Sequence, residues 1–119
     1  MDRVKIIRYK NNNILKIDYS NCNEKEMMDI VNHTRDIILV TNEKILALSI
    51  FNDKNYGTPN FIRHLERELP KYDHLIKKQA VTGLNNIQIW ILKGINLWTK
   101  SKLYHFDSTN DAMGFLVKE

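Results

Sequence analysis

The chain has 119 residues, of which 43% are hydrophobic and 27% are charged, as expected of a single ordinary globular domain spanning residues 1–119. Its net charge of +4 falls short of the concentrated positive surface of a dedicated nucleic-acid binder, so we predict no nucleic-acid partner. The most apolar stretch, residues 87–98, is interrupted by Lys93 and is too short to cross a bilayer, so we predict no transmembrane segment.

Two features of the sequence predict a cytoplasmic protein. Cys22 is the only cysteine and has no partner for an internal disulfide, which favours a reducing compartment. The first 13 residues, MDRVKIIRYKNNN, lack the apolar run of a signal peptide.

The first half of the chain predicts a hairpin, a helix and a buried strand. Two β-rich runs flank the three asparagines at residues 11–13, which favour a turn. Asn23 and Glu26 have the spacing of a capping box, and apolar residues follow at helical intervals until the predicted end near Thr41. Residues 45–51 are almost continuously apolar, as in a strand covered on both faces.

The second half repeats a strand followed by a helix. Thr58 precedes a proline and predicts the start of a helix that Pro70 ends. A buried strand at residues 76–81 then leads through a tight turn into a helix at residues 85–98. A last strand at residues 102–106 precedes a short terminal helix.

The predicted order is therefore ββαβαβαβα, which indicates the α/β class. Strands that alternate with helices imply right-handed crossovers and a mostly parallel sheet. The opening hairpin adds an antiparallel pair, so we expect a mixed sheet of about five strands with four helices.

The helix at residues 85–98 is apolar on nearly every side, and we predict that it is buried on all sides. Three roles remain open for it: packing beneath neighbouring helices, a self-complementary dimer interface, or contact with lipid beside Lys93, Lys100 and Lys102. The stripe is formed by Ile87, Ile91, Ile95 and Trp98. The candidate interface residues are Ile89, Trp90, Leu92, Leu97 and Trp98.

Candidate ligand-binding residues follow the predicted strands, because ligands of open α/β sheets collect beyond the carboxyl ends of the strands. These candidates are Asn52, Asp53, Thr58, Thr82 and Gly83. Turns and caps use the same residue types for purely structural reasons, which is the alternative interpretation. Thr58 is also a candidate phosphoacceptor, since a phosphate at a helix N-terminus meets free N–H groups; the alternative is a simple N-cap.

No pattern in the sequence indicates catalysis. The four histidines have no metal-ligand spacing, and no cysteine pair accompanies them. Ser108 follows a strand without the glycines of a nucleophile elbow. We therefore predict no metal, no cofactor and no enzymatic activity.

Three segments resemble the SpoIIAA-like, or STAS/SEC14-type, family of small bacterial proteins. IKKQAVTGLNNIQIWILKGINLW is similar to the A-V-x-G strand and turn of the family and to its long apolar helix. KLYHFDSTNDAMGFLVKE is similar to the closing strand and helix, and ILKIDYSNCNEKEM resembles the step into the first helix. The resemblance extends over essentially the whole chain and implies a single SpoIIAA-like domain.

The resemblance implies a regulatory or ligand-binding module. Phospho-regulated members of the family carry Asp-Ser-Ser-Gly after the third strand, whereas this chain has FNDKNYGTPNF, in which Thr58 is the only hydroxyl near the helix start. We therefore expect a non-catalytic protein-interaction module that forms a homodimer. The alternative is a carrier or sensor of a small apolar ligand, or a peripheral membrane module.

Overall fold

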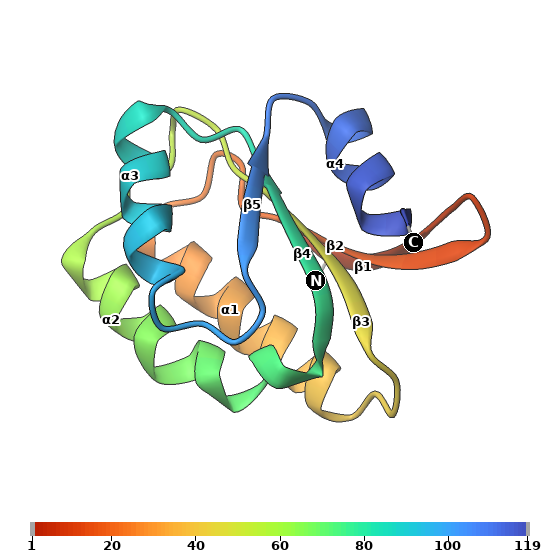
Figure 1. The fold of residues 1–119 in the computed structure, drawn as a ribbon. Helices are drawn as coiled ribbons and strands as arrows, with labels where there is room; N and C mark the ends of the chain where they lie inside the picture. The colour runs from red at the N-terminus through yellow and green to blue at the C-terminus, as the bar shows by residue number, and fades with distance from the viewer. Residues whose placement is uncertain (1, 119) are drawn as a thin grey trace.

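One five-stranded sheet runs through the computed structural model, which describes residues 2–118 (Figure 1). The spatial order of its strands is β1-β2-β3-β4-β5, with β1 antiparallel to β2 and every other pair parallel. The predicted mixed sheet with its opening hairpin is confirmed. The strands are β1 (Val4–Tyr9), β2 (Asn12–Asp18), β3 (Ile45–Ile50), β4 (Ile76–Thr82) and β5 (Leu103–Phe106).

Helices cover both faces of this sheet, three on one side and one on the other (Figure 1). The larger layer contains α1 (Glu24–Leu39), α2 (Pro59–Glu68) and α3 (Asn86–Ile95), and the opposite face carries α4 (Thr109–Val117). Two short 3-10 helices, Leu69–Lys71 and Asp73–Leu75, lead from α2 into β4.

The core is divided into two parts because successive side chains of a strand point to opposite faces. In β2, Ile14 packs in the smaller cluster beneath α4, whereas Leu15 packs in the larger cluster beneath the other three helices. In β3, Ala47 and Leu48 divide in the same way, and both are fully buried. The prediction that this strand is covered on both faces is confirmed.

Local capping signals fix the starts of the helices. The Asn23 side chain accepts from the N–H of Glu26, whose own carboxylate accepts from the N–H of Asn23, so the predicted capping box is confirmed. Thr58 caps α2 by accepting from the N–H of Phe61. Helix α1 ends at Leu39, two residues earlier than predicted, and the hydroxyl of Thr41 donates to a carbonyl of its last turn.

The turn between β4 and α3 requires a glycine. Gly83 has a φ of 84°, and a Cβ at this position would lie 1.8 Å from the carbonyl oxygen of Phe51. The neighbouring backbone therefore approaches too closely for any side chain.

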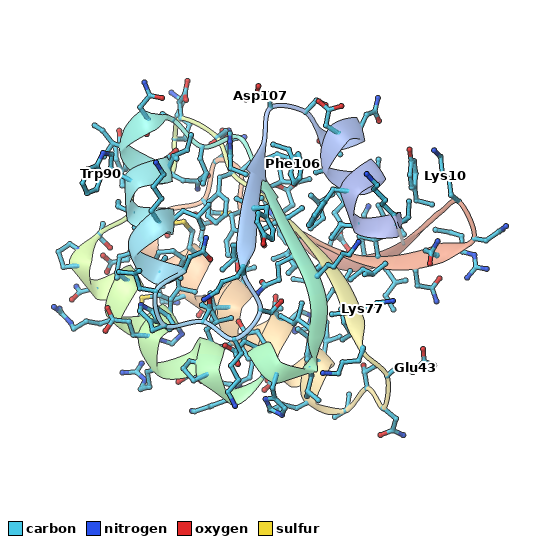
Figure 2. All side chains as sticks on the ribbon, viewed as in Figure 1. Lys10, Glu43, Lys77, Trp90, Phe106 and Asp107 are labelled. Atoms are coloured by element: carbon cyan, nitrogen blue, oxygen red, sulfur yellow. The ribbon has the colours of Figure 1, made fainter. Side chains whose placement is uncertain are left out.

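Helix α3 differs from the prediction in both length and burial. It ends at Ile95, and the side chain of the next residue, Asn96, donates to the C=O and accepts from the N–H of Leu103, each at 2.8 Å. Only one face is covered, so the prediction of burial on all sides was wrong: Ile87 and Trp90 are 74% and 78% exposed. The sheet and α2 lie on one side of the helix, and Trp90 points away from them (Figure 2).

The helices of the described chain are too short or too polar to cross a membrane. No helix within residues 2–118 combines the length and the apolar character that a bilayer span requires.

Candidate functional site

A cavity of about 100 Å³ lies between the sheet and the layer formed by α1, α2 and α3. Its walls are mainly apolar side chains, among them Met27 of α1, Phe61 of α2 and Ile91 of α3. None of the described side chains that line it carries a charge at neutral pH. A charged group placed there would lose its hydration without gaining an ion partner, so the cavity suits a neutral apolar molecule.

The two glutamines in the cavity wall are paired, whereas Thr34 is not. Gln79 donates to the carbonyl of Ser101 at 2.9 Å, and Gln88 donates to the carbonyl of Asn55 at 2.6 Å. Thr34 is 2% exposed, and its Oγ1 is the only buried oxygen or nitrogen of the cavity-lining side chains in residues 2–118 without a hydrogen-bond partner. The cavity thus has a mainly apolar lining that includes one fully buried hydroxyl without a partner, that of Thr34.

The loop after β3 closes one end of the cavity against α3. Asn55 is buried, and its side-chain amide donates to the carbonyls of Tyr19 and Cys22 at 2.8 and 3.0 Å. Gly57 brings the loop close to Ile91, since a Cβ on this glycine would lie 2.8 Å from Cδ1 of that isoleucine. The loop is therefore anchored by Asn55, and Gly57 allows it to pack closely against α3.

The candidate ligand residues at the carboxyl end of the sheet do not combine into one polar site. Asn52 forms two hydrogen bonds with Asn21, of 2.8 and 3.1 Å, which stabilise the loops that contain these residues. Asp53 is exposed, whereas Thr82 is buried within β4. Gly83 serves the close turn between β4 and α3. These residues lie at the carboxyl end of the sheet, as predicted, but the cavity lies between the sheet and the helix layer.

The candidate phosphoacceptor Thr58 is already engaged at both ends of its hydroxyl. Its Oγ1 donates to Oε2 of Glu24 at 2.5 Å and accepts from the N–H of Phe61 at 3.2 Å. A phosphate on this oxygen would break the first bond and face the Glu24 carboxylate, a repulsive arrangement.

The five candidate interface residues fall into different environments. Leu92 is 8% exposed and lines the cavity, so it belongs to the core, and Ile89 is half-buried. Trp90 and Leu97 are 78% and 87% exposed, and Trp98 is 37% exposed. Ile87, in the first turn of the helix, is exposed as well. We call Ile87 and Trp90, together with Leu97 in the turn just beyond the helix, the outer face of α3.

The described residues contain few groups poised for chemistry. Cys22 is buried, and burial raises the pKa of its thiol, which lowers its fraction of reactive thiolate. Burial also lowers the pKa of His64, assisted by the nearby positive charge of Arg67. Its two ring nitrogens are engaged by Asn32 at 2.7 Å and by Arg67 at 2.8 Å. Within residues 2–118, no three metal-ligating side chains gather at one place.

Sequence reasoning missed the residue that distinguishes the cavity. Thr34 interrupts the apolar stripe of α1 and is buried with it. The position of this hydroxyl within an apolar stripe was the signal in the sequence that could have identified Thr34. Whether the hydroxyl has a hydrogen-bond partner, however, depends on packing between elements that are distant in the sequence.

Comparison with known proteins gives a result for the fold. No family model matches the chain, and no curated protein matches its sequence. Among solved structures, it resembles the crystal structure of a protein from the DUF3478 family with a SpoIIAA-like fold, from Shewanella loihica PV-4. The TM-score is 0.71 at 16% identity, over 95% of this chain and 91% of the other. The chain therefore has a SpoIIAA-like fold, as the resemblance in its sequence predicted.

Proposed function

We propose that this protein is a non-catalytic binding module that holds a small, neutral, apolar molecule in the cavity beneath α3. The observation that carries the proposal is the cavity lined without any charged side chain, with the unpaired hydroxyl of Thr34 in its wall. A buried hydroxyl without a partner is unfavourable, and a ligand with one hydrogen-bonding group removes that cost. The buried thiol of Cys22 and the uncharged cavity both favour binding over catalysis.

The size of the cavity limits what it accepts with α3 in its present position. An apolar cavity of about 150 Å³ in another protein accommodates benzene. The cavity here is about 100 Å³, so a ligand as large as benzene or 1-hexanol requires α3 to move outward. Helix α3 is suited to such a movement, since the side chains of its outer face are exposed and only Leu92 and Ile95 of the helix are buried.

The experiment compares two ligands that differ in charge. Titration with 1-hexanol at pH 7 is expected to shift the amide NMR resonances of Thr34, Gln79 and Ile91, whereas hexanoate, which is ionised at this pH, leaves them unchanged. Equal binding of the two ligands, or shifts confined to the outer surface, would refute the proposal.

The Thr34→Val variant tests the role of the hydroxyl. It removes an unpaired buried group, so the free protein is expected to gain about 1 kcal/mol in stability while its affinity for 1-hexanol falls about fivefold, the equivalent of one hydrogen bond. Thr41→Val is the matched control: its hydroxyl donates to the carbonyl of Ile37 at 2.9 Å, so this variant loses stability and retains hexanol affinity. Denaturant unfolding and the same titration measure both effects.

A second function, homodimerisation through the outer face of α3, is favoured by a separate observation. Ile87, Trp90 and Leu97 form an exposed apolar stripe, and Gly94 interrupts it with open space, since nothing lies within 4 Å of where its Cβ would be. Two antiparallel copies of α3 related by a twofold axis would place an apolar side chain of each over the glycine of the other. A self-complementary patch of this kind is what a twofold dimer requires.

Sedimentation velocity tests the dimer. Wild type at about 50 µM is expected to sediment as a dimer, and Trp90→Glu as a monomer with an unchanged circular dichroism spectrum, because the side chain is 78% exposed. Ile6→Glu is the control, since Ile6 is 64% exposed on β1 and lies outside the patch. A monomeric wild type at this concentration contradicts self-association and leaves the cavity proposal intact.

A further inference from the structure

A second and wider hollow, of about 630 Å³, opens at the amino ends of β3, β4 and β5. It lies at the opposite end of the parallel strands from the candidate ligand residues Asn52 and Thr82. Figure 2 shows Lys77 in this region, far from Asp107 at the other end of the sheet. We call this hollow the lysine groove. Its basic residues come from separate segments and are Lys44, Lys77, Lys78, Lys100 and Lys102.

The net charge of the chain is concentrated in the lysine groove. Five lysines and one carboxylate, Asp73, line it, which gives a local charge of +4 with His74 neutral. The sequence contains 18 basic and 14 acidic residues, so the remaining chain carries 13 of each and is neutral. The small net charge of the sequence thus conceals a local field that attracts anions.

A β-bulge aims two of these lysines into the same space. Ile45 is paired with Ile76, and the next residue, Leu46, is paired with Lys78, so Lys77 is an extra residue in β4. Consecutive residues of a regular strand face opposite sides, yet Lys77 and Lys78 both line the groove. Bulges redirect side chains in this way and are frequent beside functional sites.

Three of the five amino groups, those of Lys44, Lys78 and Lys102, are held by backbone carbonyls and are not neutralised. Lys78 donates to the carbonyl of Phe115 at 3.1 Å, and Lys102 donates to that of Thr99 at 3.0 Å. Within the described residues, no carboxylate lies within 4 Å of any of the five amines. Asp73 is 2% exposed; its Oδ2 accepts from the N–H of Lys100, and its Oδ1 has no partner. Five positive charges therefore line one hollow whose single carboxylate, Asp73, forms an ion pair with none of them in the described chain.

We propose that the lysine groove binds a small polyphosphorylated molecule. Lysine amines act as compact point charges for phosphate, and the groove has no arginine fork that would favour planar carboxylates. Tyr104 and Phe115 line the groove and provide an apolar wall for the organic part of the ligand. The volume falls within the range of small-molecule sites.

A peptide that extends the sheet at β5 fits this region less well. Strand addition needs free N–H and C=O groups along the edge. The side chain of Asn96 already holds both groups of Leu103, the first residue of β5. A soluble anion in the groove needs no backbone group of the strand.

Isothermal titration calorimetry with ATP and with inorganic tripolyphosphate tests the proposal. The K77Q/K100Q variant removes the two amines that make no hydrogen bond in the described chain, and its affinity for both probes is expected to fall at least tenfold. The K5Q/K54Q variant removes two exposed lysines elsewhere and should remain within twofold of wild type. Equal losses in both variants would show that only net charge matters and would overturn the site, as would a wild type that binds neither probe at 50 mM salt.

Two further measurements test the apolar wall and the class of the ligand. Y104A should weaken ATP but leave tripolyphosphate unchanged, because tripolyphosphate has no organic part; an unchanged ATP affinity contradicts the assigned apolar wall. A single-stranded oligonucleotide that binds more than tenfold tighter than ATP would overturn the small-molecule assignment in favour of nucleic acid. Neither Lys77 nor Lys100 lines the cavity beneath α3, with which the groove shares only Ile76, so K77Q/K100Q should retain wild-type binding of 1-hexanol.

Discussion

At the scale of single residues, the strongest electrostatic feature is Glu68, whose side chain is 5% exposed at the end of α2. Burial alone would raise the pKa of this carboxyl. Hydrogen bonds from Arg35 at 2.6 Å and from Lys71 and Arg67 at 3.1 Å outweigh burial and lower its pKa from 4.5 to about 2. Because Arg35 belongs to α1, the ionised carboxylate joins α2 to α1, two of the three helices that cover the cavity.

We expect Glu68→Gln to destabilise the protein by about 1–3 kcal/mol at pH 7, since it loses charge-assisted hydrogen bonds while its cationic partners remain partly solvated. A pKa depressed in the folded state stabilises the protein above the unfolded value, so the contribution is complete above pH 4.5 and disappears as the pH falls toward 2. The difference between wild type and variant in urea unfolding should therefore shrink across this range. Glu66→Gln, an exposed acid on the same helix, should show neither effect.

At the scale of elements, signals that act within a few residues were readable from the sequence. Asn23 with Glu26, and Thr58 before its proline, identify helix starts because the cap and the N–H that donates to it are three residues apart. The exposed face of α3 was not readable, because apolar residues surround that helix and do not indicate which side meets the sheet. Asn96, the C-cap of the helix, forms side-chain hydrogen bonds with a partner seven residues away, Leu103.

The glycines of neighbouring elements provide a test of these local requirements. Gly94 lies in α3 with open space around it, so Gly94→Ala is expected to stabilise the monomer by about 0.5–1 kcal/mol through helix propensity. Gly83→Ala should instead destabilise by at least about 1–3 kcal/mol, because its positive φ and the Phe51 carbonyl exclude a side chain. Thermal unfolding at low protein concentration measures both, and stabilisation by Gly83→Ala would contradict the close backbone approach.

At the scale of the whole molecule, the two faces of the sheet are packed to different degrees. The face beneath α4 has Ile14, Leu48 and Ala80 at 0–1% exposure against one helix. The opposite face carries three helices and contains the cavity. The mixed, mostly parallel sheet was predictable from alternating elements, whereas the lining of neither site was: the cavity depends on how well three helices fit one sheet, and the lysine groove gathers lysines from positions 44 to 102.

This asymmetry predicts opposite responses to enlarged side chains on adjacent strands. Val81 lines the cavity, so Val81→Phe has space to enter and should change stability by less than about 1 kcal/mol while abolishing the binding of 1-hexanol. Leu48 lies on the fully packed face, where Leu48→Phe should cost about 1–3 kcal/mol through overpacking and leave hexanol binding unchanged. Urea unfolding combined with the NMR titration distinguishes the two. A substitution that fills existing space displaces no neighbouring atoms and therefore costs little stability. Equal destabilisation by both variants would therefore mean that the face beneath α3 is as closely packed as the other.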